Sequence, residues 1–117
     1  MKTHLLIVLA LGACSASDKL MPQTGGDPLV GKALITHYGC NACHSIPDIR
    51  GFGGGVGPPL DHFGMRAFIA GELPNTPTNL VRWIKDPHGI EKHTAMPTLG
   101  LTEKEARDVA AFLYTLD

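Results

Sequence analysis

The sequence predicts an all-α domain of three main helices joined by long loops. Three segments carry apolar residues at helical spacing between clear start and stop signals, and no segment shows the alternating pattern of a sustained strand. The chain has 117 residues, including 14 Gly and 9 Pro. This length suits one small domain and excludes a large catalytic scaffold. Because so many positions are Gly or Pro, few apolar residues remain to form the core. A small domain of this kind often needs the support of a disulfide, a metal or a cofactor.

The first predicted helix begins at Asp27-Pro28 and ends at Gly39. Asp27 supplies an N-cap acceptor, Pro28 suits the first helical position, and apolar residues then recur near helical spacing. Because glycine ends the helix, the chain should leave it directly before Cys40.

The second and third helices have equally clear boundaries. Thr76-Pro77 begins the second helix, and Pro87 prevents it from continuing. The third begins at a capping box in which Thr102 and Glu105 cap each other, and apolar residues follow at helical spacing as far as Tyr114. All three helices are therefore predicted from local signals.

Two long stretches between the helices, residues 45–64 and 88–100, are rich in Gly and Pro. A short helix over Met65–Ala70 is weakly indicated. Compact helical domains of this size normally contain less loop, so something other than helix packing must organise these segments.

The first residues have the pattern of an export signal. A basic start is followed by nine apolar or small residues, well below the roughly 20 that a membrane-spanning helix needs. Leu11-Gly12-Ala13-Cys14 resembles the bacterial lipobox, in which a peptidase cuts before the cysteine and its thiol carries a diacylglycerol. We expect residues 1–13 to be a lipoprotein signal peptide, Cys14 to carry lipid, residues 14–26 to be a lipid-anchored linker and residues 27–117 to be the domain. An ordinary export signal that contains a cysteine is the alternative.

Cys40-Asn41-Ala42-Cys43-His44 is the attachment signature for haem c. The two thiols must reach the vinyl groups of neighbouring pyrrole rings, and the next residue must bring an imidazole to the iron. Cys40 and Cys43 would then form thioethers, and His44 would be the proximal iron ligand. With lipid on Cys14, no cysteine is left for a disulfide.

Three other interpretations of this pentapeptide remain open. A thioredoxin-like redox pair normally begins a helix in a βαβ unit, and no such strands are predicted here. A structural zinc site needs four ligands, and none of the other histidines forms a second paired motif. A structural disulfide suits an exported protein but leaves the adjacent histidine unexplained.

With Gly57-Pro58-Pro59-Leu60 following the pentapeptide, the chain resembles the class I cytochromes c over about residues 28–117. The resemblance implies a small cytochrome c fold, with long loops wrapped around one covalently bound haem. It also implies that the Pro58 carbonyl accepts a hydrogen bond from His44 and that Leu60 packs on the haem. An ordinary stiff loop is the alternative for the two prolines.

Thr94-Ala95-Met96-Pro97 resembles the distal-ligand loop of the same family, which implies that Met96 is the sixth iron ligand. A thioether opposite histidine favours ferrous iron and raises the reduction potential relative to bis-His ligation. An open five-coordinate iron is one alternative. The competing ligands are His93, His62, His88 and Met65.

Three further side chains gain a role from the resemblance. Trp83 lies where the family keeps an aromatic residue beside the haem, and Arg66 lies where it often places a propionate-binding arginine. Asn75 could donate to the same propionate. A general core position is the alternative for Trp83, and an exposed surface role is the alternative for Arg66 and Asn75.

The run from Leu73 through Trp83 to Met96 is similar to cytochrome c domains that are fused to, or work beside, subunit II of haem–copper oxidases. This similarity implies an electron carrier rather than an enzyme. The carrier would pass electrons from a membrane donor complex to a terminal oxidase of a respiratory chain, on the periplasmic side of a bacterial membrane. The alternatives are a haem-based ligand sensor, a small catalytic cytochrome, and a permanent accessory haem subunit of a larger membrane complex.

The charge balance argues against nucleic acid as a partner. The chain has 10 basic and 11 acidic residues, and phosphate binding needs a basic excess on one face. Scattered lysines are candidate docking charges, although such residues more often only keep a domain soluble. These lysines are Lys32, Lys85, Lys92 and Lys104.

Overall fold

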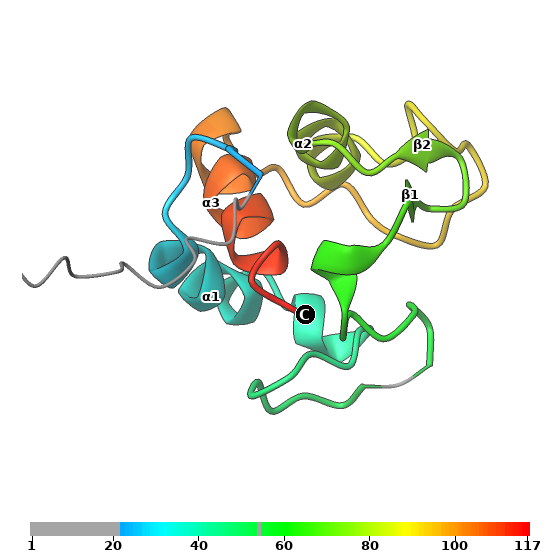
Figure 1. The fold of residues 1–117 in the computed structure, drawn as a ribbon. Coiled ribbons are helices and arrows are strands. Elements are labelled where there is room, and N and C mark those ends of the chain that lie inside the picture. Colours follow the sequence, from blue (N-terminus) through cyan, green and yellow to red (C-terminus); the bar gives the residue numbers. More distant parts are fainter. Residues whose placement is uncertain (1–21, 54) are drawn as a thin grey trace, which may run out of the picture.

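The computed structural model describes residues 22–53 and 55–117 and contains three α-helices within them. They are α1 (Pro28–His37), α2 (Pro77–Lys85) and α3 (Glu103–Leu113). Helix α3 packs against both α1 and α2, and the long loops lie to one side of this group (Figure 1). The predicted all-α class and its three helices are confirmed.

The N-terminal predictions lie mainly outside the described residues. These include the signal peptide over residues 1–13, the lipid on Cys14 and most of the linker over residues 14–26. In the part of the chain that the structure describes, no helix is long and apolar enough to cross a membrane.

Each helix begins at the residue that the sequence indicated. The Asp27 carboxylate accepts from the N–H of Leu29 at 2.8 Å and caps α1. The Thr76 hydroxyl accepts from the third residue of α2. At α3 the capping box is complete, because the Glu105 carboxylate accepts from the Thr102 N–H at 2.8 Å and the Thr102 hydroxyl accepts from the Glu105 N–H at 3.2 Å.

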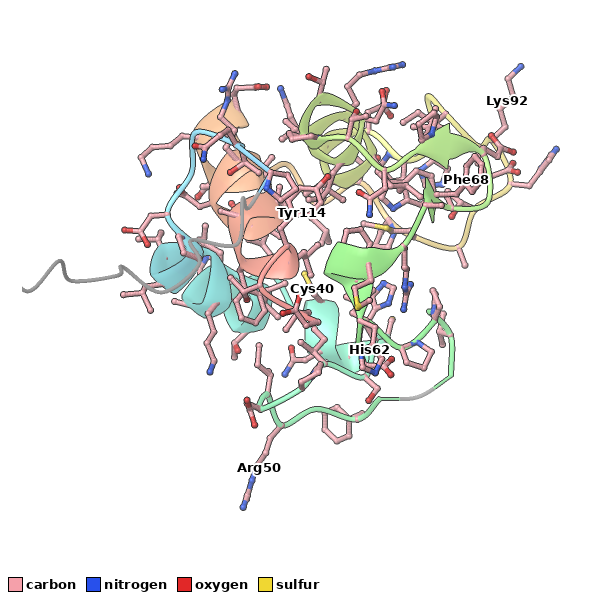
Figure 2. The ribbon with its side chains drawn as sticks, viewed as in Figure 1. Cys40, Arg50, His62, Phe68, Lys92 and Tyr114 are labelled. Carbon is pink, nitrogen blue, oxygen red and sulfur yellow. The ribbon has the colours of Figure 1, made fainter. Side chains whose placement is uncertain are left out.

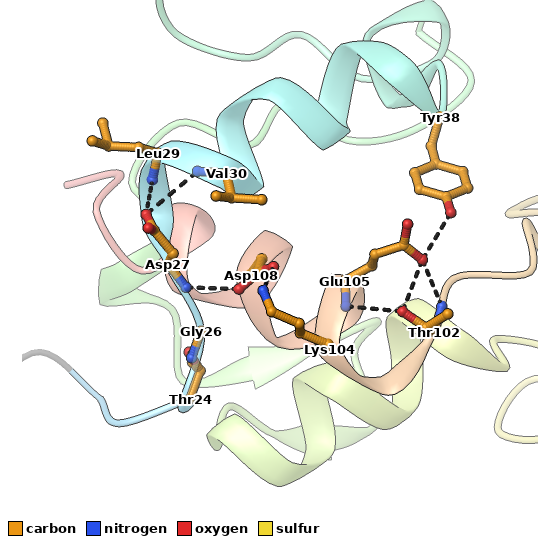
Figure 3. Close-up of polar contacts among 10 residues, drawn as sticks. All are labelled: Thr24, Gly26, Asp27, Leu29, Val30, Tyr38, Thr102, Lys104, Glu105 and Asp108. Carbon is orange, nitrogen blue, oxygen red and sulfur yellow. Dashed lines mark hydrogen bonds and ion pairs between the residues drawn. The ribbon is translucent and has the colours of Figure 1, made fainter.

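Helices α1 and α3 cross with their backbones in close approach. A Cβ atom at Gly31 would lie 1.9 Å from the carbonyl oxygen of Asp108, so only glycine fits this point of α1. The buried Asp108 carboxylate accepts from the Asp27 N–H at 2.8 Å and from the Lys104 ammonium at 2.7 Å (Figure 3). Burial raises the pKa of Asp108, but these hydrogen bonds outweigh burial and leave the pKa below its ordinary value.

A second contact joins the other end of α1 to α3. The Tyr38 hydroxyl donates to Glu105 at 2.9 Å, so the carboxylate that caps α3 also holds the C-terminal end of α1 (Figure 3). The hydrogen bonds from the Thr102 N–H and hydroxyl and from Tyr38 lower the pKa of Glu105. The two contacts fix α1 on α3 just before the chain enters the cysteine motif.

The prediction of a short helix over Met65–Ala70 is wrong. Residues Phe63–Met65 form a single 3₁₀ turn, and Phe68–Ile69 forms a strand, β1, that pairs antiparallel with β2 (Leu73–Pro74). The turn between the strands has Ala70 at φ 51° and Gly71 at φ 71°, left-handed values that end any helix there. The strands are only two residues long, too short for an alternating pattern in the sequence.

Candidate haem-binding site

The cysteine motif forms one tight turn at the end of α1. Gly39 has φ 74°, a left-handed conformation that favours glycine, and it redirects the chain into a 3₁₀ turn over Cys40–Ala42. The N–H groups of Cys43 and His44 donate to the Cys40 carbonyl, at 3.2 and 2.9 Å. Both thiols are free and half-buried, and burial raises the pKa of the Cys40 thiol. The turn thus presents two thiols and an imidazole from one short segment.

These side chains open onto a largely apolar cavity of about 340 Å³, within the range that holds cofactors in proteins. Figure 2 shows Cys40 well inside the molecule, with Arg50 and Lys92 pointing away from it. All the residues predicted to hold the haem except Asn75 line this cavity. They are Cys40, Cys43, His44, Pro58, Leu60, Arg66, Trp83 and Met96.

The imidazole of His44 is held from the loop that follows it. His44 Nδ1 lies 2.7 Å from the Pro58 carbonyl oxygen, an acceptor, so Nδ1 donates and Nε2 keeps its lone pair. A Cβ at Gly57 would lie 2.4 to 2.8 Å from three atoms of the ring, so the Gly57 backbone packs directly on the imidazole. The loop is joined to the motif by two further hydrogen bonds, from the Gly57 N–H to the Cys43 carbonyl and from the Leu60 N–H to the Ser45 carbonyl.

Met96 reaches the same cavity from the segment between α2 and α3 and is half-buried there. Its N–H donates to the Thr94 hydroxyl at 3.2 Å, and the Thr94 N–H donates to the Glu91 carbonyl at 3.2 Å. None of the four competing ligands lines the cavity; all of them are exposed. These four are His93, His62, His88 and Met65.

The donor set fits haem c. Two free thiols at the spacing of the attachment signature, an imidazole with Nδ1 occupied and a thioether all border one apolar cavity. The cytochrome c family model matches residues 30–117. The chain belongs to the cytochrome c family. Its cofactor is covalently bound haem c, and the family role is haem-based electron transfer.

Two relatives place this cytochrome c within the family. The chain is 32% identical over 87 residues to cytochrome c oxidase subunit 2 of Alkalihalophilus pseudofirmus, a match that covers 74% of this chain and 25% of the relative. It is 32% identical over 96 residues to the same subunit of Bacillus sp. strain PS3, covering 77% of this chain and 27% of the relative. This class I cytochrome c thus spans about a quarter of the length of these relatives.

The cytochrome holds Arg66 against its own loop. The guanidinium donates to the carbonyl oxygens of Pro59 and Asp61, the latter at 3.1 Å, and lies 5.5 Å above the ring of Phe63. It therefore fixes the segment that follows Pro58 and also lines the haem cavity. Trp83 lies half-buried on α2 and forms part of the cavity wall.

Asn75 lies outside the cavity wall and joins three parts of the chain. Its amide nitrogen donates to the carbonyls of Phe63 at 3.2 Å and Arg66 at 2.9 Å, and its amide oxygen accepts from the Tyr114 hydroxyl at 2.8 Å. The structure therefore uses both amide hydrogens on main-chain carbonyls. Burial raises the pKa of Tyr114 to about 12, so this phenol remains a donor at physiological pH.

Sequence reasoning gave no role to two residues that the geometry singles out. Gly57 stood inside the quoted Gly-Pro-x-Leu motif, yet its contact with His44 depends on how the loop folds back. Glu91 carries no local signal, although it lines the cavity.

Proposed function

We propose that this cytochrome c passes electrons one at a time to a terminal haem–copper oxidase in a membrane-associated respiratory chain, and that His44 and Met96 would hold the haem iron. One observation carries the proposal: a single apolar cavity is lined by both attachment cysteines, by the braced imidazole and by the Met96 thioether. The similarity to oxidase subunit 2 supports this acceptor.

Haem c supplies the one-electron ferrous–ferric couple when bound. Cys40 and Cys43 hold it by thioether bonds, so it cannot dissociate. The Pro58 carbonyl orients the His44 ring and makes it a stronger ligand. Met96 favours the ferrous state, and the apolar wall excludes water, which also disfavours the more highly charged ferric state.

The proposal places the domain on the periplasmic side of a bacterial membrane, anchored by lipid on Cys14. A linker over residues 14–26 would confine the domain near integral partners and raise its effective concentration there. Intact mass and a pyridine haemochrome spectrum of protein extracted from membranes test the lipid, the haem and both thioethers together. A mass without lipid, in protein that is released without detergent, contradicts the anchor.

Met96→Leu tests the axial ligation. We expect the variant to change a low-spin, six-coordinate spectrum into a high-spin one, because leucine offers no lone pair to the iron. An unchanged spectrum rules Met96 out. Rapid binding of CO by the reduced wild-type protein would show an open or labile sixth site and favour the ligand sensor.

The acceptor is tested by stopped-flow oxidation of the reduced cytochrome by haem–copper oxidase purified from the same organism. We expect oxidation within the turnover time of the oxidase. An oxidase that does not oxidise the cytochrome contradicts this acceptor while leaving the haem site intact. Co-purification in mild detergent at fixed stoichiometry would instead indicate a permanent accessory subunit.

A further inference from the structure

The segment that presents Met96 is built from successive short turns. The Asp86 carboxylate accepts from the Gly89 N–H at 3.0 Å, and the N–H groups of Ile90 and Glu91 both donate to the Pro87 carbonyl. The chain then reaches Met96 within five residues. The position of the thioether therefore depends on how firmly the last turn is held.

Glu91 lies at the centre of these turns. Its N–H donates to the Pro87 carbonyl at 2.9 Å, its carbonyl accepts from the Thr94 N–H at 3.2 Å, and its carboxylate accepts from the His93 N–H at 2.7 Å. The next hydrogen bond along the segment joins the Thr94 hydroxyl to the Met96 N–H. Glu91 is thus bonded to the turns on both of its sides.

Glu91 is also one of the residues that line the haem cavity. It is half-buried and is the one carboxylate among the described residues that line the cavity. A charge-assisted hydrogen bond from a main-chain N–H to a carboxylate is stronger than one between neutral groups and favours one position of the side chain. A surface glutamate that served only solubility would need neither the position nor the bond.

We infer that Glu91 is the positioning residue of the distal ligand, since its carboxylate caps the His93 N–H and so fixes the turn from which Thr94 and Met96 enter the cavity. The inference rests on the proposed ligation by Met96. It has a second consequence, because a fixed negative charge on the cavity wall stabilises ferric haem over ferrous haem.

Three variants of the haem-loaded protein separate these effects. Glu91→Ala removes the acceptor and the charge, whereas Glu91→Gln keeps a carbonyl acceptor and removes only the charge. Glu72→Gln is the matched control, since Glu72 is exposed at the turn between β1 and β2 and does not line the cavity. Unchanged circular dichroism shows that each variant is folded.

Added imidazole, which competes with the thioether for ferric iron, measures how firmly Met96 is held. We expect Glu91→Ala to bind imidazole about tenfold more tightly than wild type, as the loss of a charge-assisted hydrogen bond implies. Glu91→Gln should stay near wild type, and so should the Glu72 control. Both Glu91 variants should have a higher reduction potential than the control. Equal imidazole affinity in wild type and Glu91→Ala, or a Glu91→Gln variant as weakened as Glu91→Ala, overturns the inference.

Amide hydrogen exchange separates this inference from the proposed ligation. We expect the His93 amide to exchange faster in Glu91→Ala than in Glu91→Gln, whether or not Met96 binds iron, because the cap itself is lost. A wild-type spectrum without thioether ligation contradicts ligation by Met96 and the positioning role that rests on it, and leaves the cap on the His93 N–H intact. Equal His93 exchange in the two variants contradicts the cap alone.

Discussion

On the proximal side of the haem cavity, hydrogen bonds join residues far apart in the chain: His44 to Pro58, 14 positions away, and the Leu60 N–H to the Ser45 carbonyl. On the distal side, the bonds described within residues 86–97 each join residues at most four positions apart. Contacts across a closed loop hold a ligand in place once the whole loop has folded, whereas local turns open one at a time. Of the two proposed ligands, His44 is therefore the more rigidly held, and Met96 is the one expected to yield first.

The largest effect is expected from replacing the two cysteines that are proposed to attach the haem. The double variant Cys40→Ala, Cys43→Ala should lose all covalently attached haem, because no thiol remains for a thioether. Extraction into acidified organic solvent measures this loss, and Cys14→Ser serves as the control that keeps the haem. With the cavity no longer filled, the domain should also unfold at lower denaturant concentration. Haem that stays with the double variant contradicts the assignment of the attachment turn.

Gly57→Ala tests the rigidity of the proximal side directly. A Cβ there would lie within 2.4 to 2.8 Å of three atoms of the His44 ring, so we expect a loss of about 1–3 kcal/mol in the free energy of unfolding and an altered haem spectrum. Denaturant unfolding and visible spectra measure the two effects.

Gly71→Ala is the control for this substitution. A Cβ at Gly71 would meet nothing within 4 Å, and φ 71° there costs about 1 kcal/mol of backbone strain for alanine, with no change at the haem. If Gly57→Ala leaves the spectrum unchanged, the Gly57 contact does not position the imidazole.

Thr94→Val should weaken the distal side while leaving the proximal side unchanged. Valine has nearly the same shape but no acceptor for the Met96 N–H, which costs about 1 kcal/mol. We expect tighter binding of added imidazole, in the same direction as Glu91→Ala, with no shift in the nuclear magnetic resonance signals of His44. Thr98→Val, on an exposed residue outside the cavity, is the matched control. An effect of equal size in the control contradicts the role of the Thr94 hydroxyl.

Asp108 tests the contact between α1, which leads into the cysteine motif, and α3, which follows the Met96 segment. Its pKa is lowered in the folded protein, so its stabilising contribution is complete well above the ordinary value of about 4 and is lost as pH falls through the lowered pKa. Asp108→Asn keeps an acceptor for the Asp27 N–H but loses the ion pair with Lys104, whose side chain is 76% exposed.

We therefore expect Asp108→Asn to lower the free energy of unfolding by only about 0.5–1 kcal/mol at pH 7. Between pH 5 and pH 3, this free energy should fall less in the variant than in wild type. Unfolding curves at several pH values measure both. If the free energy of unfolding falls equally in both proteins as the pH is lowered, carboxylates other than Asp108 control acid unfolding.

The lysines show how tertiary contacts restrict a sequence-based interpretation. Lys85 lies 2.7 Å from Glu103, and Lys104 lies 2.7 Å from Asp108, so both are already paired within the domain. Lys32 and Lys92 are exposed. The last two are the better candidates for docking charges.

The sequence by itself determined the helices, and it was enough to propose the attachment site. The caps at Asp27, Thr76 and Thr102 depend on residues two or three positions away, and the cysteine spacing depends on one turn. Such short-range signals can be recognised from neighbouring residues alone. The Met96 motif was also recognised from the sequence, but the hydrogen bonds that hold its segment were not.

Only the tertiary structure decided what holds the ligands. The β1–β2 pairing replaced an expected helix, and Asn75 is bonded to Tyr114, 39 positions away, rather than to the cavity. Gly57 packs on the His44 ring because the loop closes back over it. These contacts form between segments that come together only when the chain folds around the haem cavity, and residue spacing carries no record of them.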